Sequence, residues 1–170
     1  MLPLDLTDPD NPVPGKPEVF LQTPFREQEP MFSPDGRWIG YQSDESGRNE
    51  IYIRPYPGPG AKVQISSGGG VSVRWSRTAQ ELFFVGDDGR LSMVRYSVTG
   101  GRFEASKPAV WSSVYVNRST SGSVGQDIAP DGKHFAVIRA AENLTGQVPI
   151  TALVNFADEV RRRMAEVVGK

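Results

Sequence analysis

Hydrophobic residues in this sequence gather in short continuous runs, each of which follows a polar turn. The runs are WIGY at 38–41, LFFV at 82–85 and HFAVI at 134–138. A strand in a sheet with one wet face alternates apolar and polar residues, whereas a strand packed on both faces is apolar throughout. The pattern therefore predicts an all-β protein whose central strands are buried on both faces.

Helical periodicity is confined to the last fifteen residues, FADEVRRRMAEVVGK. One face of a helix there would carry Phe156, Val160, Met164 and Val167. We expect a short C-terminal α-helix over about residues 157–168. It would dock on the sheets, and a membrane or partner anchor is the alternative.

A turn motif recurs along the chain. SPDG at 33–36 fits a type I turn, because Pro presets φ at its second position and Gly suits its fourth. A related segment begins at Ser76, 43 residues after Ser33, and APDG at 129–132 follows 53 residues later. A period of about 40 to 50 residues with four strands per unit is typical of β-propeller blades. An ordinary β-sandwich is the alternative. The predicted four-stranded antiparallel blades are 28–68, 70–113 and 125–156.

The turn and the strands after it resemble a known repeat. SPDG at 33–36, an apolar strand, and Ile51-Tyr52 in the next strand are similar to the repeats of TolB-like β-propellers. The second unit departs from that pattern, with Arg77-Thr78-Ala79 in place of Pro-Asp-Gly, and the third keeps the turn. The resemblance covers about residues 17–156. It extends to the C-terminal propeller region of large bacterial proteins that carry a kinase or DNA-binding domain. It implies a fold, and it leaves the function open because propellers serve many functions.

Three blades are too few to close a ring, since propellers contain about four to eight. An open arc of three blades would expose two apolar faces. We therefore expect two chains to form a homodimer that closes a six-bladed ring. The segment PEVFLQ, residues 17–22, would complete the third blade of the partner by strand addition. The alternative is that the chain is a piece of a longer propeller.

Composition excludes several classes of function. The formal net charge of −1 gives no basic surface for nucleic acid, and no apolar run approaches the roughly 18 residues of a membrane span. There is no cysteine, and the one histidine, His134, is predicted on a buried strand, so neither a thiolate metal site nor a histidine cluster is expected. We expect no metal and no cofactor. The compartment would be cytoplasmic for a complete chain, and periplasmic for part of a secreted or membrane-anchored parent.

Motifs for catalysis are incomplete. TSGSVGQ lacks the glycine that a nucleophile elbow needs two residues before Ser123, and the glycine-rich segment 66–72 lacks the Lys-Ser/Thr of a phosphate-binding loop. We interpret segment 66–72 as a turn between blades and GDDGR, 86–90, as a hairpin turn.

The entry segments of the innermost strands supply the candidate binding residues. These are Arg26, Gln28, Glu29, Arg74, Gln126 and Asp127. Polar groups of both signs on one axis predict a non-catalytic binding or scaffold module for a protein, a peptide or a small ligand. Alternatively, these groups only hydrate the channel. One alternative function is a hydrolase or lyase with an axial acidic or metal site at Glu29 and Asp127. Another is a sensor segment of a larger signalling protein.

Overall fold

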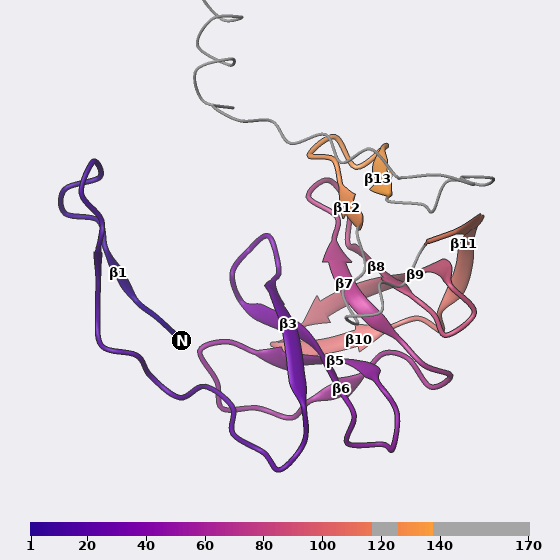
Figure 1. Ribbon diagram of the computed structural model, residues 1–170, viewed down its shortest axis with the longest axis horizontal. Helices are drawn as coiled ribbons and strands as arrows, with labels where there is room; N and C mark the ends of the chain where they lie inside the picture. The colour runs from indigo at the N-terminus through magenta and orange to yellow at the C-terminus, as the bar shows by residue number, and fades with distance from the viewer. Residues whose placement is uncertain (117–125, 138–170) are drawn as a thin grey trace, which may run out of the picture. The chain divides into compact units, whose positions relative to one another are not determined.

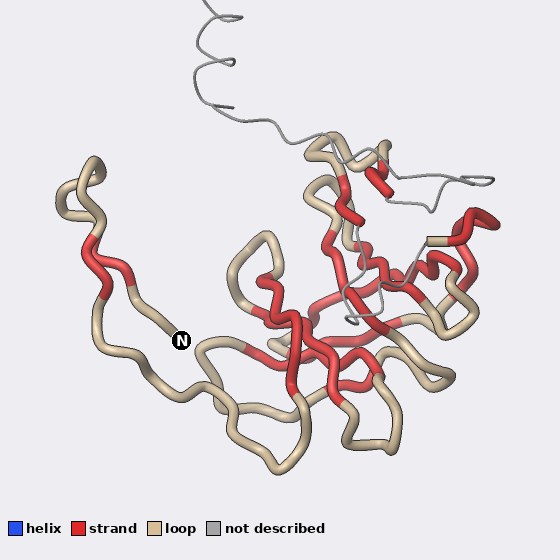
Figure 2. Tube along the Cα trace, in the orientation of Figure 1, coloured by secondary structure: helices blue, strands red, loops and turns tan. Residues whose placement is uncertain are grey.

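The computed structural model describes residues 1–116 and 126–137, and these are all-β (Figure 1). Their strands form several antiparallel sheets joined by loops and turns (Figure 2). The predicted C-terminal helix at about 157–168 and the later strands of the third unit lie outside the described residues. Within the described part, no helix is long and apolar enough to cross a membrane.

The first sheet is a four-stranded antiparallel meander, which we call the first repeat (residues 27–64). Its strands, in spatial order, are β3 (Glu27–Phe32), β4 (Trp38–Ser43), β5 (Glu50–Pro55) and β6 (Val63–Gln64). All six residues of β4 are buried. The continuous apolar run at 38–41 thus belongs to a strand that is covered on both faces, as the sequence predicts.

The second sheet, or second repeat (residues 71–115), has five strands where four were predicted. They are β7 (Val71–Trp75), β8 (Glu81–Val85), β9 (Arg90–Thr99), β10 (Arg102–Ala105) and β11 (Ala109–Tyr115). The prediction missed β10. Strand β9 is ten residues long, and its second half continues past β8 into a hairpin whose turn is Gly100-Gly101. Both glycines have positive φ, 57° and 78°, which a two-residue hairpin turn requires.

The third repeat is described only over residues 126–137. It is a two-stranded antiparallel hairpin of β12 (Gln126–Ile128) and β13 (Phe135–Val137). A second small hairpin, of β1 (Leu4–Asp5) and β2 (Val13–Pro14), lies near the N-terminus.

Residues 17–22 form no strand within this chain. Phe20 and Leu21 instead pack against the face of the first repeat that carries Ile39 and Tyr41. Addition of this segment to a second copy stays a prediction.

The three turns close in the same way. The backbone N–H of Ser33 donates to the carbonyl of Trp38, and Ser76 to Glu81 and Ala129 to His134 repeat this bond, at 2.8 to 2.9 Å. Gly36 and Gly132, the last residues of the two intact turns, share a φ of +67°. The alignment of the three units from the sequence is therefore also an alignment of their backbones.

A bulge occupies the same position in the first two repeats. Glu29 and Ser72, 43 residues apart, have φ of 50° and 60° and lie where β3 and β7 shift register against their neighbours. Positive φ is uncommon outside glycine. Its recurrence at equivalent residues indicates one backbone design for both sheets.

Two hydrophobic clusters join the repeats. The larger lies between the first and second repeats and contains Trp38, Ile51, Ile53, Ile65, Val73, Trp75, Leu82, Phe84, Val94 and Phe103. The smaller contains Val71, Val85, Leu91 and Val116, and Phe135 and Val137 of the third repeat pack against it. Alternate residues of β8 thus enter different clusters, because successive side chains of a strand point to opposite faces.

The glycine-rich segment 66–72 was predicted as a turn between units. Residues 66–70 lie in the connection from β6 to β7, and Val71 and Ser72 already belong to β7. The connection encloses Glu50, whose buried carboxylate accepts hydrogen bonds from the Ser66 hydroxyl and from the backbone N–H of Gly69. This polar contact holds the connection against the first repeat.

Candidate functional site

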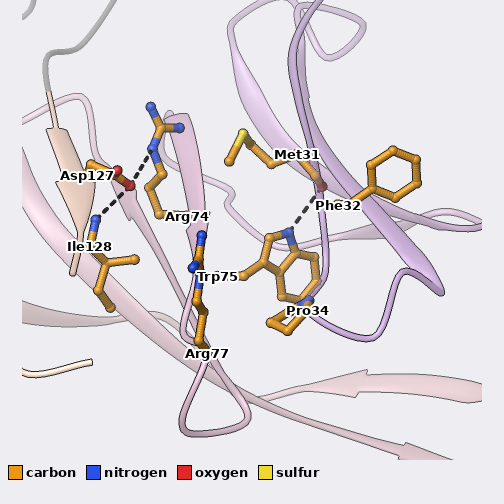
Figure 3. A pocket seen from close by; sticks show the side chains of 8 residues that line it. All are labelled: Met31, Phe32, Pro34, Arg74, Trp75, Arg77, Asp127 and Ile128. Carbon is orange, nitrogen blue, oxygen red and sulfur yellow. Dashed lines mark hydrogen bonds and ion pairs between the residues drawn. The ribbon is translucent and has the colours of Figure 1, made fainter. Parts of the chain in front are cut away.

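A cleft of about 420 Å³ lies where the first strands of the three repeats meet (Figure 3). Strand β7 contacts β3 on one side and β12 on the other. Eight residues line the cleft: Met31, Phe32, Pro34, Arg74, Trp75, Arg77, Asp127 and Ile128. Each comes from the end of a first strand or from the turn that follows it.

Equivalent positions of the three repeats meet in this cleft. Met31, Arg74 and Asp127 each stand two residues before the residue that closes the turn. Phe32, Trp75 and Ile128 each stand one residue before it. The repeated backbone therefore places three different chemical groups (a thioether, a cation and an anion) at one location.

Arg74 joins the second repeat to the third. Its Nε donates to the carbonyl of Gln126 at 3.1 Å, and its Nη1 donates to the carbonyl of Val73 at 2.8 Å. The same Nε lies 3.9 Å from Oδ1 of Asp127, a side chain that is 77% exposed. Two carbonyls fix the guanidinium, and the exposed carboxylate balances its charge.

Trp75 joins the second repeat to the first. The indole is buried, and its Nε1 donates to the carbonyl of Met31 at 3.2 Å. On another side it packs edge-on against Tyr96, with ring centroids 5.2 Å apart. The aromatic wall of the cleft is thus held by both packing and a hydrogen bond, as buried indoles usually require.

Arg77 is the uncompensated charge of the cleft. Its side chain makes no ion pair or hydrogen bond with any other described residue. Arg74 and Asp127 balance each other, so the charged groups that line the cleft sum to +1. Figure 3 shows Arg77 extending from the turn toward the space that Arg74 and Trp75 border.

A chain of side-chain amides runs behind the cleft across all three repeats. Gln42 donates to Oε1 of Gln28 at 3.2 Å, and its own Oε1 accepts from the backbone N–H of Ser72 at 3.3 Å. Gln126 then donates to the carbonyl of Ser72 at 2.8 Å. Buried polar groups paired in this way fix the register of the first strands relative to one another.

Three atoms along this chain are buried without a hydrogen-bond partner among the described residues. They are Oε2 of Glu29, Oγ of Ser72 and Oε1 of Gln126. Buried polar groups are normally paired, so each of these atoms can accept or donate a further hydrogen bond.

The predicted site residues separate into two groups. Arg74 and Asp127 line the cleft, and the carbonyl of Gln126 accepts from Arg74 beside it. The side chains of Gln126 and Gln28 belong to the amide chain. The side chain of Glu29 lies at the bulge and does not line the cleft, and Arg26 is an exposed residue just before β3.

Sequence reasoning missed the residues that give the cleft its apolar wall and its free charge. These are Met31, Phe32, Pro34, Trp75, Arg77 and Ile128. The signal that could have found them is the repeat alignment itself, because the residues before each aligned turn must share a location.

His134 is exposed, which corrects its predicted place on a buried strand. It precedes β13, and its Nδ1 lies 2.6 Å from Oδ2 of Asp131. Among the described residues, no group of three or more His, Asp or Glu side chains is arranged to hold a metal ion.

No protein-family model matches this chain, and a search of curated proteins gave no significant match. The resemblance to TolB-like propellers therefore rests on the quoted motifs and stays a prediction.

Proposed function

We propose that the three repeats are blades of a TolB-like β-propeller, and that two copies of the chain close a six-bladed ring. The shared turn closures, the shared bulge and the contacts of β7 with both β3 and β12 support this arrangement. In a propeller the first strand of each blade lines the axis, and consecutive first strands are neighbours.

The face of the first repeat that carries Ile39 and Tyr41 supports a second copy as its neighbour, although Phe20 and Leu21 of the same chain already bury both residues. Leu82 and Phe84 of the second repeat are buried against the first repeat. Their equivalents in the first repeat are Ile39 and Tyr41, 43 residues earlier. A preceding blade would cover these two residues in the same way, and in the ring that blade is the third blade of the partner.

The N-terminal segment already lies at that face. Phe20 and Leu21 pack beside Ile39 and Tyr41, and they border an apolar cleft of about 310 Å³. An outer strand of the partner's third blade would occupy this neighbourhood. The position of the segment therefore supports the proposed strand addition.

The proposed function is non-catalytic binding of a protein, a peptide or a small ligand in the cleft of the first strands. One observation carries it: equivalent positions of three repeats present an apolar group, a cation and an anion at a single cleft. Ligand sites combine an apolar lining with a few fixed polar groups in this manner.

The native mass in solution tests the ring. Light scattering after size exclusion should give about 37 kDa, twice the 18.6 kDa of the chain. Deletion of residues 1–24 should remove the dimer peak, because it removes the strand added to the partner. A monomer of the intact chain would contradict the ring, and an unchanged dimer after the deletion would contradict strand addition.

A further inference from the structure

We infer that the cleft recognises a carboxylate joined to a large apolar group, with Arg77 as the anchor of the carboxylate. This inference rests on the proposal that the cleft is a binding site. A peptide C-terminus with an apolar last residue and a free aromatic acid share this chemistry.

The charge of the cleft selects the anion. Arg74 is engaged by two backbone carbonyls and by Asp127, whereas Arg77 pairs with no other described residue. The resulting charge of +1 matches a monoanion. The carboxylate of Asp127 would repel the second charge of a phosphate dianion. A guanidinium also matches the two oxygens of a carboxylate geometrically.

The opposite wall selects the apolar group. Met31 is 37% exposed although it is a large hydrophobic residue, and the buried indole of Trp75 donates to its carbonyl. Phe32 also lines the cleft, while its ring packs against Tyr56 with centroids 5.0 Å apart. A flexible thioether beside aromatic rings adapts to ligands of different shape. In Figure 3 the side chain of Met31 points toward Arg74 and Asp127, whereas the ring of Phe32 points away from them.

The polar pair between these two regions suits a peptide group. Arg74 Nη2 makes no hydrogen bond with any other described residue, and Oδ2 of Asp127 likewise accepts none. A donor and an acceptor side by side are what a backbone amide needs. The volume of about 420 Å³ falls in the range of sites that hold small ligands, so the end of a peptide fits.

Calorimetric titration of the intact chain with N-acetyl-Leu-Phe tests the inference. The free acid should bind about tenfold more tightly than its C-terminal amide, since one charge-assisted hydrogen-bonded contact accounts for about that factor. Arg77→Met should remove this difference. Arg102→Met is the matched control, because Arg102 is an exposed arginine on β10 that does not line the cleft, and it should change nothing.

The remaining comparisons distinguish a peptide end from a free acid, and they distinguish failure of this inference from failure of the proposed function. Tighter binding of the dipeptide acid than of 3-phenylpropionate indicates a peptide end, and equal binding indicates a free acid. Equal affinity for the acid and the amide overturns the inferred recognition of a carboxylate, and the cleft remains a binding site as proposed. Absence of binding by all three probes overturns the inference, whereas the mass of the same sample reports on the ring independently.

Discussion

The turns of the first and second repeats reach one backbone geometry with different residues. In the first, Ser33 donates to Oδ1 of Asp35 at 2.5 Å, the same carboxylate accepts from the N–H of Arg37, and Gly36 adopts φ +67°. In the second, Oγ of Ser76 accepts from two backbone N–H groups, those of Thr78 and Ala79. No carboxylate and no left-handed glycine is needed there.

The difference shows which part of the motif the fold requires. Both turns retain the backbone bond from the serine N–H to the strand carbonyl, 2.8 Å for Ser33 and 2.9 Å for Ser76. In the first turn, proline, aspartate and glycine stabilise the loop between these ends. In the second turn, a single serine hydroxyl stabilises it. The bond and the buried strand that follows are the shared requirement.

The largest effect should come from the interface that the two repeats share. Phe84→Ala should lower the free energy of unfolding by about 3 to 5 kcal/mol, because a buried aromatic ring between two sheets leaves a cavity. Urea denaturation followed by tryptophan fluorescence measures the loss. Val110→Ala, at an exposed residue of β11, is the control and should cost less than about 0.5 kcal/mol. A loss below about 1 kcal/mol for Phe84→Ala would contradict double-sided packing.

Replacing the glycine should destabilise the two turns that retain Pro-Asp-Gly, 33–36 and 129–132, by different amounts. Gly36→Ala should cost about 1 to 2 kcal/mol from backbone strain alone, since nothing lies near a Cβ there. Gly132→Ala should cost more, because the new Cβ would also lie 2.2 Å from Oγ1 of Thr78. Thermal unfolding of the two variants measures the order. The double variant Gly132→Ala with Thr78→Ala should return to the cost of Gly36→Ala, and equal losses for both single variants would refute the contact between the turns.

Replacing the serine should destabilise the turn of the second repeat, which lacks Pro-Asp-Gly, more than the turn of the first. Ser76→Ala removes the acceptor of two N–H groups, whereas Ser33→Ala removes the acceptor of one, that of Trp38, and leaves the Asp35 carboxylate in place for Arg37. We expect losses of about 1 to 2 kcal/mol for Ser76→Ala and about 1 kcal/mol or less for Ser33→Ala. Ser→Thr at each position is the conservative control. The reverse order in denaturant unfolding would show that the carboxylate does not substitute for the hydroxyl.

Acid should affect the first turn and leave the second unchanged. Burial opposes the charged form of Asp35, but the Ser33 hydroxyl and the Arg37 N–H outweigh it, so the pKa of Asp35 lies below its ordinary value of 3.8. A carboxyl with a lowered pKa stabilises the fold above pH 3.8, and this contribution is lost as the pH falls through the lowered pKa. The amide NMR signal of Arg37 should therefore shift in that acidic range while that of Ala79 stays constant. A shift of both amides together would indicate general unfolding instead.

Strand positions followed from the sequence where a turn and a continuous apolar run coincide. Strands β4 and β8 were predicted in this way, because burial on both faces leaves no polar alternation. Strand β10 was missed because it has only four residues, RFEA, of which Phe103 alone is buried. Residues 17–22 have the composition of a strand, but no strand edge among residues 1–116 and 126–137 accepts them.

The site was predictable only in part. Arg74, Gln126 and Asp127 were found by asking which polar residues lie on the first strands. Trp75 was missed because its buried indole is indistinguishable in sequence from a core residue, and its bond to the carbonyl of Met31 joins residues 44 apart. Pairings at such separation depend on how two sheets pack, which the strand pattern does not specify.

The three turn closures use backbone atoms that every residue except proline supplies as a donor, and they stand directly beside the cleft. Residues 31, 74 and 127 are therefore free to change without disturbing the hydrogen bonds that end their strands. One substitution at residue 31 or 127 alters the charge or the shape of the cleft and needs no compensating change in the core, whereas Arg74 also joins the second repeat to the third. Under the proposed binding function, single substitutions at these positions change what the cleft recognises while the architecture stays constant.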